Sequence, residues 1–164
     1  MAWYLLLGIS NGMRTMTPVA VLCWFSWLRL FPEPGWAFWT GNLISVIIFT
    51  LCAVGEYFGD TRSNIGNRTD PPQLLARLAF GGLAGALAAQ SMAEPIIGGV
   101  LFAWVGVLIG AFGGLRVRLW LSRKLNSNTA AGLCESALAL GLALLSAWML
   151  HVSNLPPTDV PLMP

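Results

Sequence analysis

The chain has 164 residues, of which 56% are hydrophobic and 10% are charged, with a net charge of +2. Its mean hydropathy is +0.70. Because a soluble domain carries roughly a quarter charged residues, this composition excludes that class and indicates an integral membrane protein. Apolar stretches of helix-spanning length follow one another, without the roughly ten-residue alternation of a membrane β-barrel. We therefore expect an all-α, polytopic helical membrane bundle that forms a single domain over residues 1–164.

The first apolar region covers residues 2–31 and would be roughly 45 Å long as one helix. The apolar core of a bilayer is only about 30 Å thick, so we expect a break. Thr17-Pro18 is the predicted place, because proline lacks a backbone donor and disfavours helix at the preceding residue. Asn11 and Arg14 could satisfy the backbone groups that the break frees.

Four further spans are expected after this region, separated by polar or proline-containing connections. They cover residues 41–59, 71–92, 96–121 and 129–151. The prediction is therefore five spans, or six segments if the part before Pro18 re-enters the membrane instead of crossing it.

The basic residues predict the orientation of the bundle. Seven of the nine lie around the second-to-third and fourth-to-fifth connections: Arg62, Arg68, Arg77, Arg116, Arg118, Arg123 and Lys124. Since Lys and Arg are enriched in short cytoplasmic loops, we expect these connections and the N-terminus to be cytoplasmic and the C-terminus to lie on the opposite side. If the first segment re-enters the membrane instead of crossing it, the prediction of a cytoplasmic N-terminus fails.

Glu56 and Glu135 lie within apolar stretches, and the predicted orientation places both at a similar depth near the cytoplasmic face. A carboxyl group in hydrocarbon costs several kcal/mol unless it is paired, protonated or hydrated, so such residues are functional-site candidates by default. Asp60 follows Glu56 by four residues and therefore shares its helical face. Two close carboxylates do not both ionise cheaply in a low dielectric.

Arginines are available to neutralise these acids. Arg14 falls near mid-membrane on the first span, and Arg77 and Arg116 fall at the cytoplasmic ends of the third and fourth. Two alternatives follow. Either the charges pair and hold the bundle together, or at least one carboxyl group binds a proton or an ion in a site that also contains Asn11 and Arg14.

Glycine pairs form a second pattern. The string GxxxG(M/L)R occurs at residues 8–14 and again at 110–116, and further GxxxG pairs occur at 81–85 and 106–110. The recurrence suggests an internal repeat, which is typical of transporters when it places broken helices and charges at a central site. Small faces let helix backbones approach closely, and we expect a homo-oligomer that associates through them.

Residues 60–70 form the most polar stretch of the chain. Four of its side chains, together with Arg77 and Arg116, could hold an anion or a lipid headgroup ahead of a helix N-terminus; they are Arg62, Asn64, Asn67 and Arg68. The alternative is an ordinary cytoplasmic loop. The chain has no nucleophile–base pair, HExxH or P-loop motif, so we expect no catalytic residues, no metal, no cofactor and no nucleic-acid partner.

Three strings of the sequence resemble a family of bacterial membrane proteins known as a domain of unknown function. They are GISNGMRTMTPVAVLCW at 8–24, GEYFGDTRSNIGNRTDPPQLLARLAFGGLAGAL at 55–87, and GAFGGLR at 110–116 followed by Glu135. The resemblance implies a helical bundle in a bacterial inner membrane and no established activity. It places six residues at characteristic positions: Arg14, Glu56, Asp60, Arg68, Arg77 and Glu135.

Three functions fit these residues. The first is a permease-like transporter of an ion or small solute, with Glu56 and Glu135 as proton or cation sites and Arg14 as a counter-ion or anion contact. The second is a membrane-embedded enzyme that acts on lipid headgroups, with phosphate, and a divalent metal if one is used, held by the 60–70 loop. The third is a structural or accessory subunit whose charges only pair. Of these we favour the transporter over the enzyme. The expected partners are membrane lipid and a small ion or solute.

Overall fold

The computed structural model describes residues 1–32, 35–59 and 70–155. These residues form helices and no strand, which confirms the all-α prediction. The elements are α1 (Ala2–Met13), α2 (Thr17–Trp27), the 3-10 helix η1 (Gly35–Gly41), α3 (Leu43–Gly59), α4 (Pro71–Ser91), α5 (Ile96–Leu125) and α6 (Asn128–Asn154).

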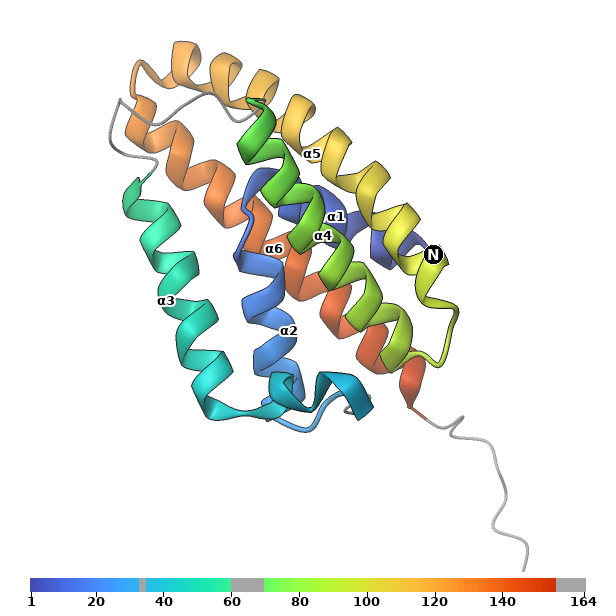
Figure 1. Cartoon of the computed structure of the whole chain (residues 1–164). Coiled ribbons are helices and arrows are strands. Elements are labelled where there is room, and N and C mark those ends of the chain that lie inside the picture. The colour runs from blue at the N-terminus through green and yellow to red at the C-terminus, as the bar shows by residue number, and fades with distance from the viewer. Residues whose placement is uncertain (33–34, 60–69, 156–164) are drawn as a thin grey trace, which may run out of the picture.

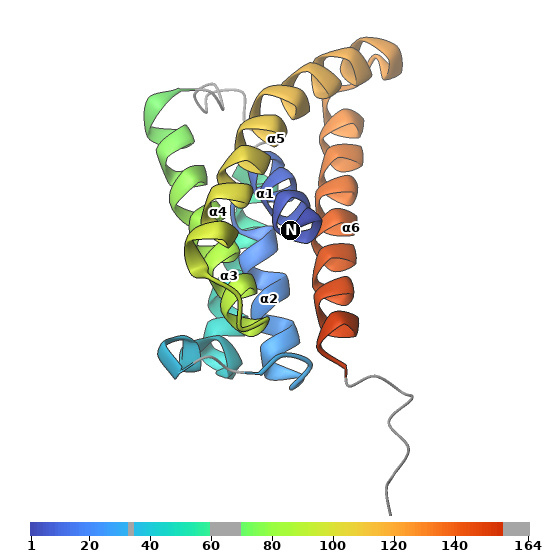
Figure 2. The same cartoon turned by 90° about the vertical axis from the view of Figure 1, so that its right-hand side faces the viewer.

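The helices differ in how far they extend along the bundle. Figure 1 shows α3, α4, α5 and α6 running between its two ends, with the C-terminal end of α3 and the start of α6 at the same end. α1 lies inside the bundle against α4, α5 and α6, and its start is about halfway between the ends in both views (Figures 1 and 2). α2 covers only the half that leads to η1. The other half, beside the C-terminal end of α3 and the start of α6, is therefore not covered by α2.

The described helices bury small side chains and expose large apolar ones. The buried positions of α5 are Gly99, Ala103, Gly106, Val107, Gly110, Ala111 and Gly114. Its exposed positions include Trp104, Leu108 and Phe112. In water such a surface would drive aggregation, whereas in lipid it is the expected pattern, because small residues let helix backbones pack closely and large ones face the acyl chains. The burial pattern therefore supports a membrane location.

The number of spans differs from the prediction of five. Among the described helices, three are long and apolar enough to cross a membrane, namely α4, α5 and α6. The pair of η1 and residues Leu43–Phe58, bent by 68°, makes a fourth if it is one span. α1 and α2 have 12 and 11 residues, which gives roughly 18 and 16 Å. Neither reaches across an apolar core of about 30 Å.

The break in the first apolar region lies close to the predicted place. α1 ends at Met13, Arg14 is extended with φ −139° and ψ 113°, and Pro18 lies in the first turn of α2. Proline suits that turn because its missing N–H is one that the helix leaves unpaired anyway. The first apolar region is therefore two helices, α1 and α2, with the break near Pro18. The predicted cytoplasmic N-terminus assumed a first segment that crosses the membrane. Since α1 does not cross the bundle, that assumption no longer supports it.

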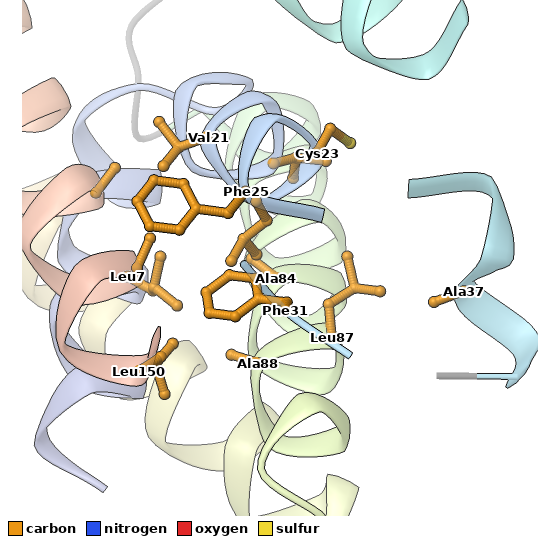
Figure 3. Close-up of a cluster of buried hydrophobic side chains, with 14 of the residues drawn as sticks. Leu7, Val21, Cys23, Phe25, Phe31, Ala37, Ala84, Leu87, Ala88 and Leu150 are labelled. Atoms are coloured by element: carbon orange, nitrogen blue, oxygen red, sulfur yellow. The ribbon is translucent and has the colours of Figure 1, made fainter. Parts of the chain in front are cut away.

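A compact apolar cluster holds α2 against its neighbours. The rings of Phe25 and Phe31 stack with centroids 5.4 Å apart, and Figure 3 shows them between Leu7 of α1, Leu150 of α6 and side chains of α4. Leu7 and Leu150 are fully buried. This cluster fixes α2, and with it the break that precedes α2.

The predicted glycine faces pack within one chain. A Cβ atom at Gly8 would collide with the backbone of Ala103, and one at Gly110 would collide with the backbone of Ile9. The 8–12 and 106–110 pairs therefore form a close α1–α5 contact, and Gly85 packs in the same way on Gly99. These faces are therefore filled inside the chain, and the expected homo-oligomer stays a prediction.

Candidate functional site

The break between α1 and α2 is held from one side by Glu56. Its two carboxylate oxygens accept hydrogen bonds from the backbone N–H of Thr15 at 2.9 Å and of Met16 at 3.0 Å. Met16 is the N-cap of α2, a position where N–H groups lack partners within the helix. A negative charge is favourable there because the helix dipole is positive at its N-terminus. Glu56, in the last turns of α3, therefore caps α2.

Arg77 holds the break from the other side. Its Nη1 donates to the carbonyl oxygen of Gly12 at 2.6 Å and approaches that of Asn11 at 3.5 Å. These carbonyls belong to the last turn of α1, where no intrahelical donor follows and a positive charge is favourable. Arg77 is 5% exposed. A buried arginine from α4 thus caps α1, as a partly buried glutamate from α3 caps α2.

Arg14 lies in the break itself and is 2% exposed. Its Nη1 donates to the backbone carbonyl of Glu56 at 3.3 Å, and its guanidinium lies over the ring of Tyr57, 4.9 Å from the centroid. A cation over an aromatic face gains roughly 0.5–2 kcal/mol, more where water is excluded. Two predicted site residues, Arg14 and Glu56, are therefore in contact, because Arg14 binds to the backbone of the helix that carries Glu56.

Asn11 satisfies a backbone group that the break frees, as predicted. Its Nδ2 donates to the carbonyl of Thr15 at 2.8 Å, and the residue is fully buried. Two polar atoms here, Oδ1 of Asn11 and Oγ1 of Thr17, are buried without a hydrogen-bond partner among the described residues. Buried polar atoms of this kind commonly bind ordered water.

Glu135 faces α5 and is 3% exposed. Its Oε2 lies 3.7 Å from Nη1 of Arg118, which makes Arg118 a charge partner that sequence reasoning passed over. Arg116, the predicted partner, is exposed. The signal was present in the sequence: Arg118 follows the buried Gly114 by four residues and shares its face, whereas Arg116 is two residues from Gly114 and points elsewhere. The second GxxxG(M/L)R string therefore does not repeat the role of Arg14.

A cavity of about 230 Å³ lies beside this cluster. Its walls are the link between α1 and α2, the last turns of α3, the end part of α5 and the first turns of α6. The polar side chains that line it are Arg14, Tyr57, Arg118, Asn128, Thr129 and Ser136. It occupies the part of the bundle that α2 does not reach, so the broken first region is what makes room for it.

The lining of this cavity is positive. Arg14 and Arg118 reach it, and no acidic side chain is among the described residues that line it. Glu56 and Glu135 are both close by, but Glu56 points its oxygens at the backbone of α2 and Glu135 lies behind Arg118. The start of α6 adds the positive end of a helix dipole. The arrangement suits a negatively charged group.

Five predicted site residues fall outside the described residues: Asp60, Arg62, Asn64, Asn67 and Arg68. The two proposed groups, one around the glutamates and one on the loop, are therefore only partly placed. Within the described ranges, no group of three His, Cys, Asp or Glu side chains could hold a metal ion.

Comparisons with protein-family models, with curated proteins and with solved structures find no match. The resemblance to a bacterial membrane family of unknown function therefore stays a prediction, and the function is argued from the site alone.

Proposed function

We propose that this protein is a permease-like membrane protein of a bacterial inner membrane, which moves a small solute through the cavity beside the α1–α2 break. The observation that carries the proposal is a cavity lined by two arginines, beside a broken helix whose two ends are capped by Glu56 and Arg77. Discontinuous helices that expose backbone ends and charges at a substrate site are characteristic of secondary transporters.

The charged residues have different roles in this proposal. Arg14 and Arg118 contact the solute, because both line the cavity. Glu135 sets the charge around Arg118 from 3.7 Å. Glu56 keeps the link in place, since both of its carboxylate oxygens accept backbone hydrogen bonds. This division favours Glu56 as a positioning residue over Glu56 as a proton carrier.

A path through the membrane requires access to the cavity from both sides, and cysteine labelling tests this without knowledge of the solute. Cys23, Cys52 and Cys134 are first replaced by alanine. Gly132→Cys, at a partly exposed position that lines the cavity, is then labelled with a charged, membrane-impermeant methanethiosulfonate in right-side-out and in inside-out vesicles. We expect labelling from both sides, because a permease exposes its site to each side in turn.

α6 supplies two matched controls. Ser146 and Ser153 both donate their hydroxyl to the carbonyl four residues earlier, so the two serine-to-cysteine changes are chemically the same. Ser146 is fully buried and should resist labelling from either side. Ser153 is exposed at the other end of α6 and should react from one side only. Labelling of Gly132→Cys from a single side under all conditions would reject a path and favour a headgroup enzyme or an accessory subunit.

A further inference from the structure

We infer that the cavity binds an anion, specifically a small oxyanion or the phosphate group of a lipid, and not a cation. This inference rests on the proposed function for its site, although it concerns the chemistry of the ligand instead of its movement. The observations are the charges that surround the cavity, the donors that reach it and its volume.

The described side chains that line the cavity carry positive charge. Within the described ranges, three guanidinium groups lie at the break and around the cavity with two carboxylates: those of Arg14, Arg77 and Arg118 with those of Glu56 and Glu135. Of these five side chains, only two arginines line the cavity. In a site with little water the attraction of such groups for an anion is much stronger than in bulk solvent, and a cation would meet two guanidinium groups at close range.

The geometry of the arginines suits oxygens of an anion. A guanidinium group presents several N–H donors in one plane and matches carboxylate and phosphate oxygens in pairs. Asn128 and Thr129, in the first turn of α6, add polar side chains to the lining. The α1–α2 link, α5 and α6 therefore all contribute polar side chains to the cavity.

The volume limits the size of the ligand. The cavity measures about 230 Å³, which is below the roughly 300–1,000 Å³ of pockets for drug-sized ligands. Water occupies about 30 Å³ per molecule in the liquid. A phosphate-sized ion with a few waters fits this space, and so does a single headgroup phosphate.

Gly132 offers a position from which to measure the charge of the cavity. A Cβ atom built on it lies 3.8 Å from Nη2 of Arg118, an ordinary contact, so Gly132→Cys places a thiol in the cavity without a clash. In the background without native cysteines, its rate of reaction is measured with the anionic sulfonatoethyl and the cationic trimethylammonium-ethyl methanethiosulfonates. The ratio of the two rates cancels the intrinsic reactivity of the thiol.

We expect the anionic reagent to gain about tenfold or more over the cationic one, relative to the same ratio at the exposed Ser153→Cys, because a cleft lined by one sign of charge raises the local concentration of counter-ions by that order. Adding Arg118→Gln should remove most of this gain, and Arg118→Lys should keep it. Equal ratios at Gly132→Cys and Ser153→Cys would overturn the inference.

Protection from labelling provides a second measurement that needs no arginine variant. Gly132→Cys is reconstituted in phosphatidylcholine vesicles and labelled with and without millimolar inorganic phosphate, and again in vesicles that contain phosphatidic acid. Slower labelling with inorganic phosphate identifies a soluble anion, and slower labelling with phosphatidic acid identifies a headgroup. No protection in either arm counts against an anion site.

The failure of this inference is distinguishable from failure of the proposed function. Access from both sides without preference for the anionic reagent would reject the anion and keep the path. Preference for the anionic reagent with access from one side only would keep the anion site and reject the path.

Discussion

Arg77 donates a hydrogen bond of 2.6 Å to the carbonyl oxygen of Gly12, and through it a side chain of α4 closes the C-terminal end of α1. A buried carbonyl at a helix end costs roughly 1–3 kcal/mol if it has no hydrogen-bond donor. The arginine therefore stabilises a helix end that would otherwise be buried without this donor.

The replacement Arg77→Met keeps the length of the side chain and removes its donors. We expect a loss of about 2–3 kcal/mol in unfolding free energy, since a hydrogen bond to a charged group is worth roughly 1.5–3 kcal/mol. Unfolding in detergent measures it. Arg116→Met is the matched control, because Arg116 is exposed and such changes stay within about 0.5 kcal/mol. Equal losses for both variants would contradict the capping role.

Glu56→Gln tests the cap of α2. An amide keeps one acceptor oxygen but loses the second acceptor and the charge, so one of the N–H groups of Thr15 and Met16 is left without its partner. We expect a loss of about 1–3 kcal/mol in the same unfolding assay. Asp70 serves as the comparison: it is the N-cap of α4 without a side-chain cap bond, so Asp70→Asn should cost clearly less. A result in which Asp70→Asn costs as much would assign the effect to net charge.

Two glycines of α5 test the close contact with α1. At Gly110 an added Cβ would meet the backbone of Ile9, whereas at Gly113 it would meet nothing within 4 Å. Gly110→Ala should therefore destabilise by about 1–3 kcal/mol through overpacking. Gly113→Ala should be neutral or stabilise by roughly 0.5–1 kcal/mol, because alanine is the better helix former. If both changes were neutral, α1 would not pack on this face.

A double-mutant cycle tests the Arg118–Glu135 pair. Arg118→Gln removes a positive neighbour from a carboxylate that is 3% exposed. At 3.7 Å we expect a loss of about 2 kcal/mol, below the roughly 3–5 kcal/mol for breaking an isolated buried pair. Arg118→Gln combined with Glu135→Gln should recover part of it, with a coupling energy of at least about 0.5 kcal/mol. Additive losses would show that the two side chains do not interact.

Much of the fold could be predicted because its signals are local. The composition indicated a helical membrane protein, and the starts and ends of α3 to α6 were predicted to within a few residues from proline and polar connections. The number of spans was wrong for a nonlocal reason. Whether α1 crosses the membrane or stays inside the bundle depends on its contacts with α5 and α6, which the spacing of its own residues does not reveal.

Sequence reasoning identified several of the residues that meet at the break, but not the contacts between them. Arg14, Asn11, Glu56 and Arg77 do meet at the break. Sequence reasoning considered Glu56 as an arginine-paired acid or as a proton or ion site, and did not consider it as a helix cap. The N–H groups that it accepts from, those of Thr15 and Met16, belong to backbone that only becomes available once the helix breaks. Sequence reasoning also chose Arg116 over Arg118, although the helical phase of Gly114 distinguishes the two.

The position of α1 has a consequence for how the protein is made. Tyr4 bonds to Glu94, 90 residues later, and Ser10 bonds to the carbonyl of Ala139, 129 residues later. α1 therefore emerges from the ribosome well before the helices that enclose it have been made, and contacts so distant in sequence form slowly. The contact of α1 with α6 can therefore form only after α6 has been made, so α1 takes its final place late in assembly.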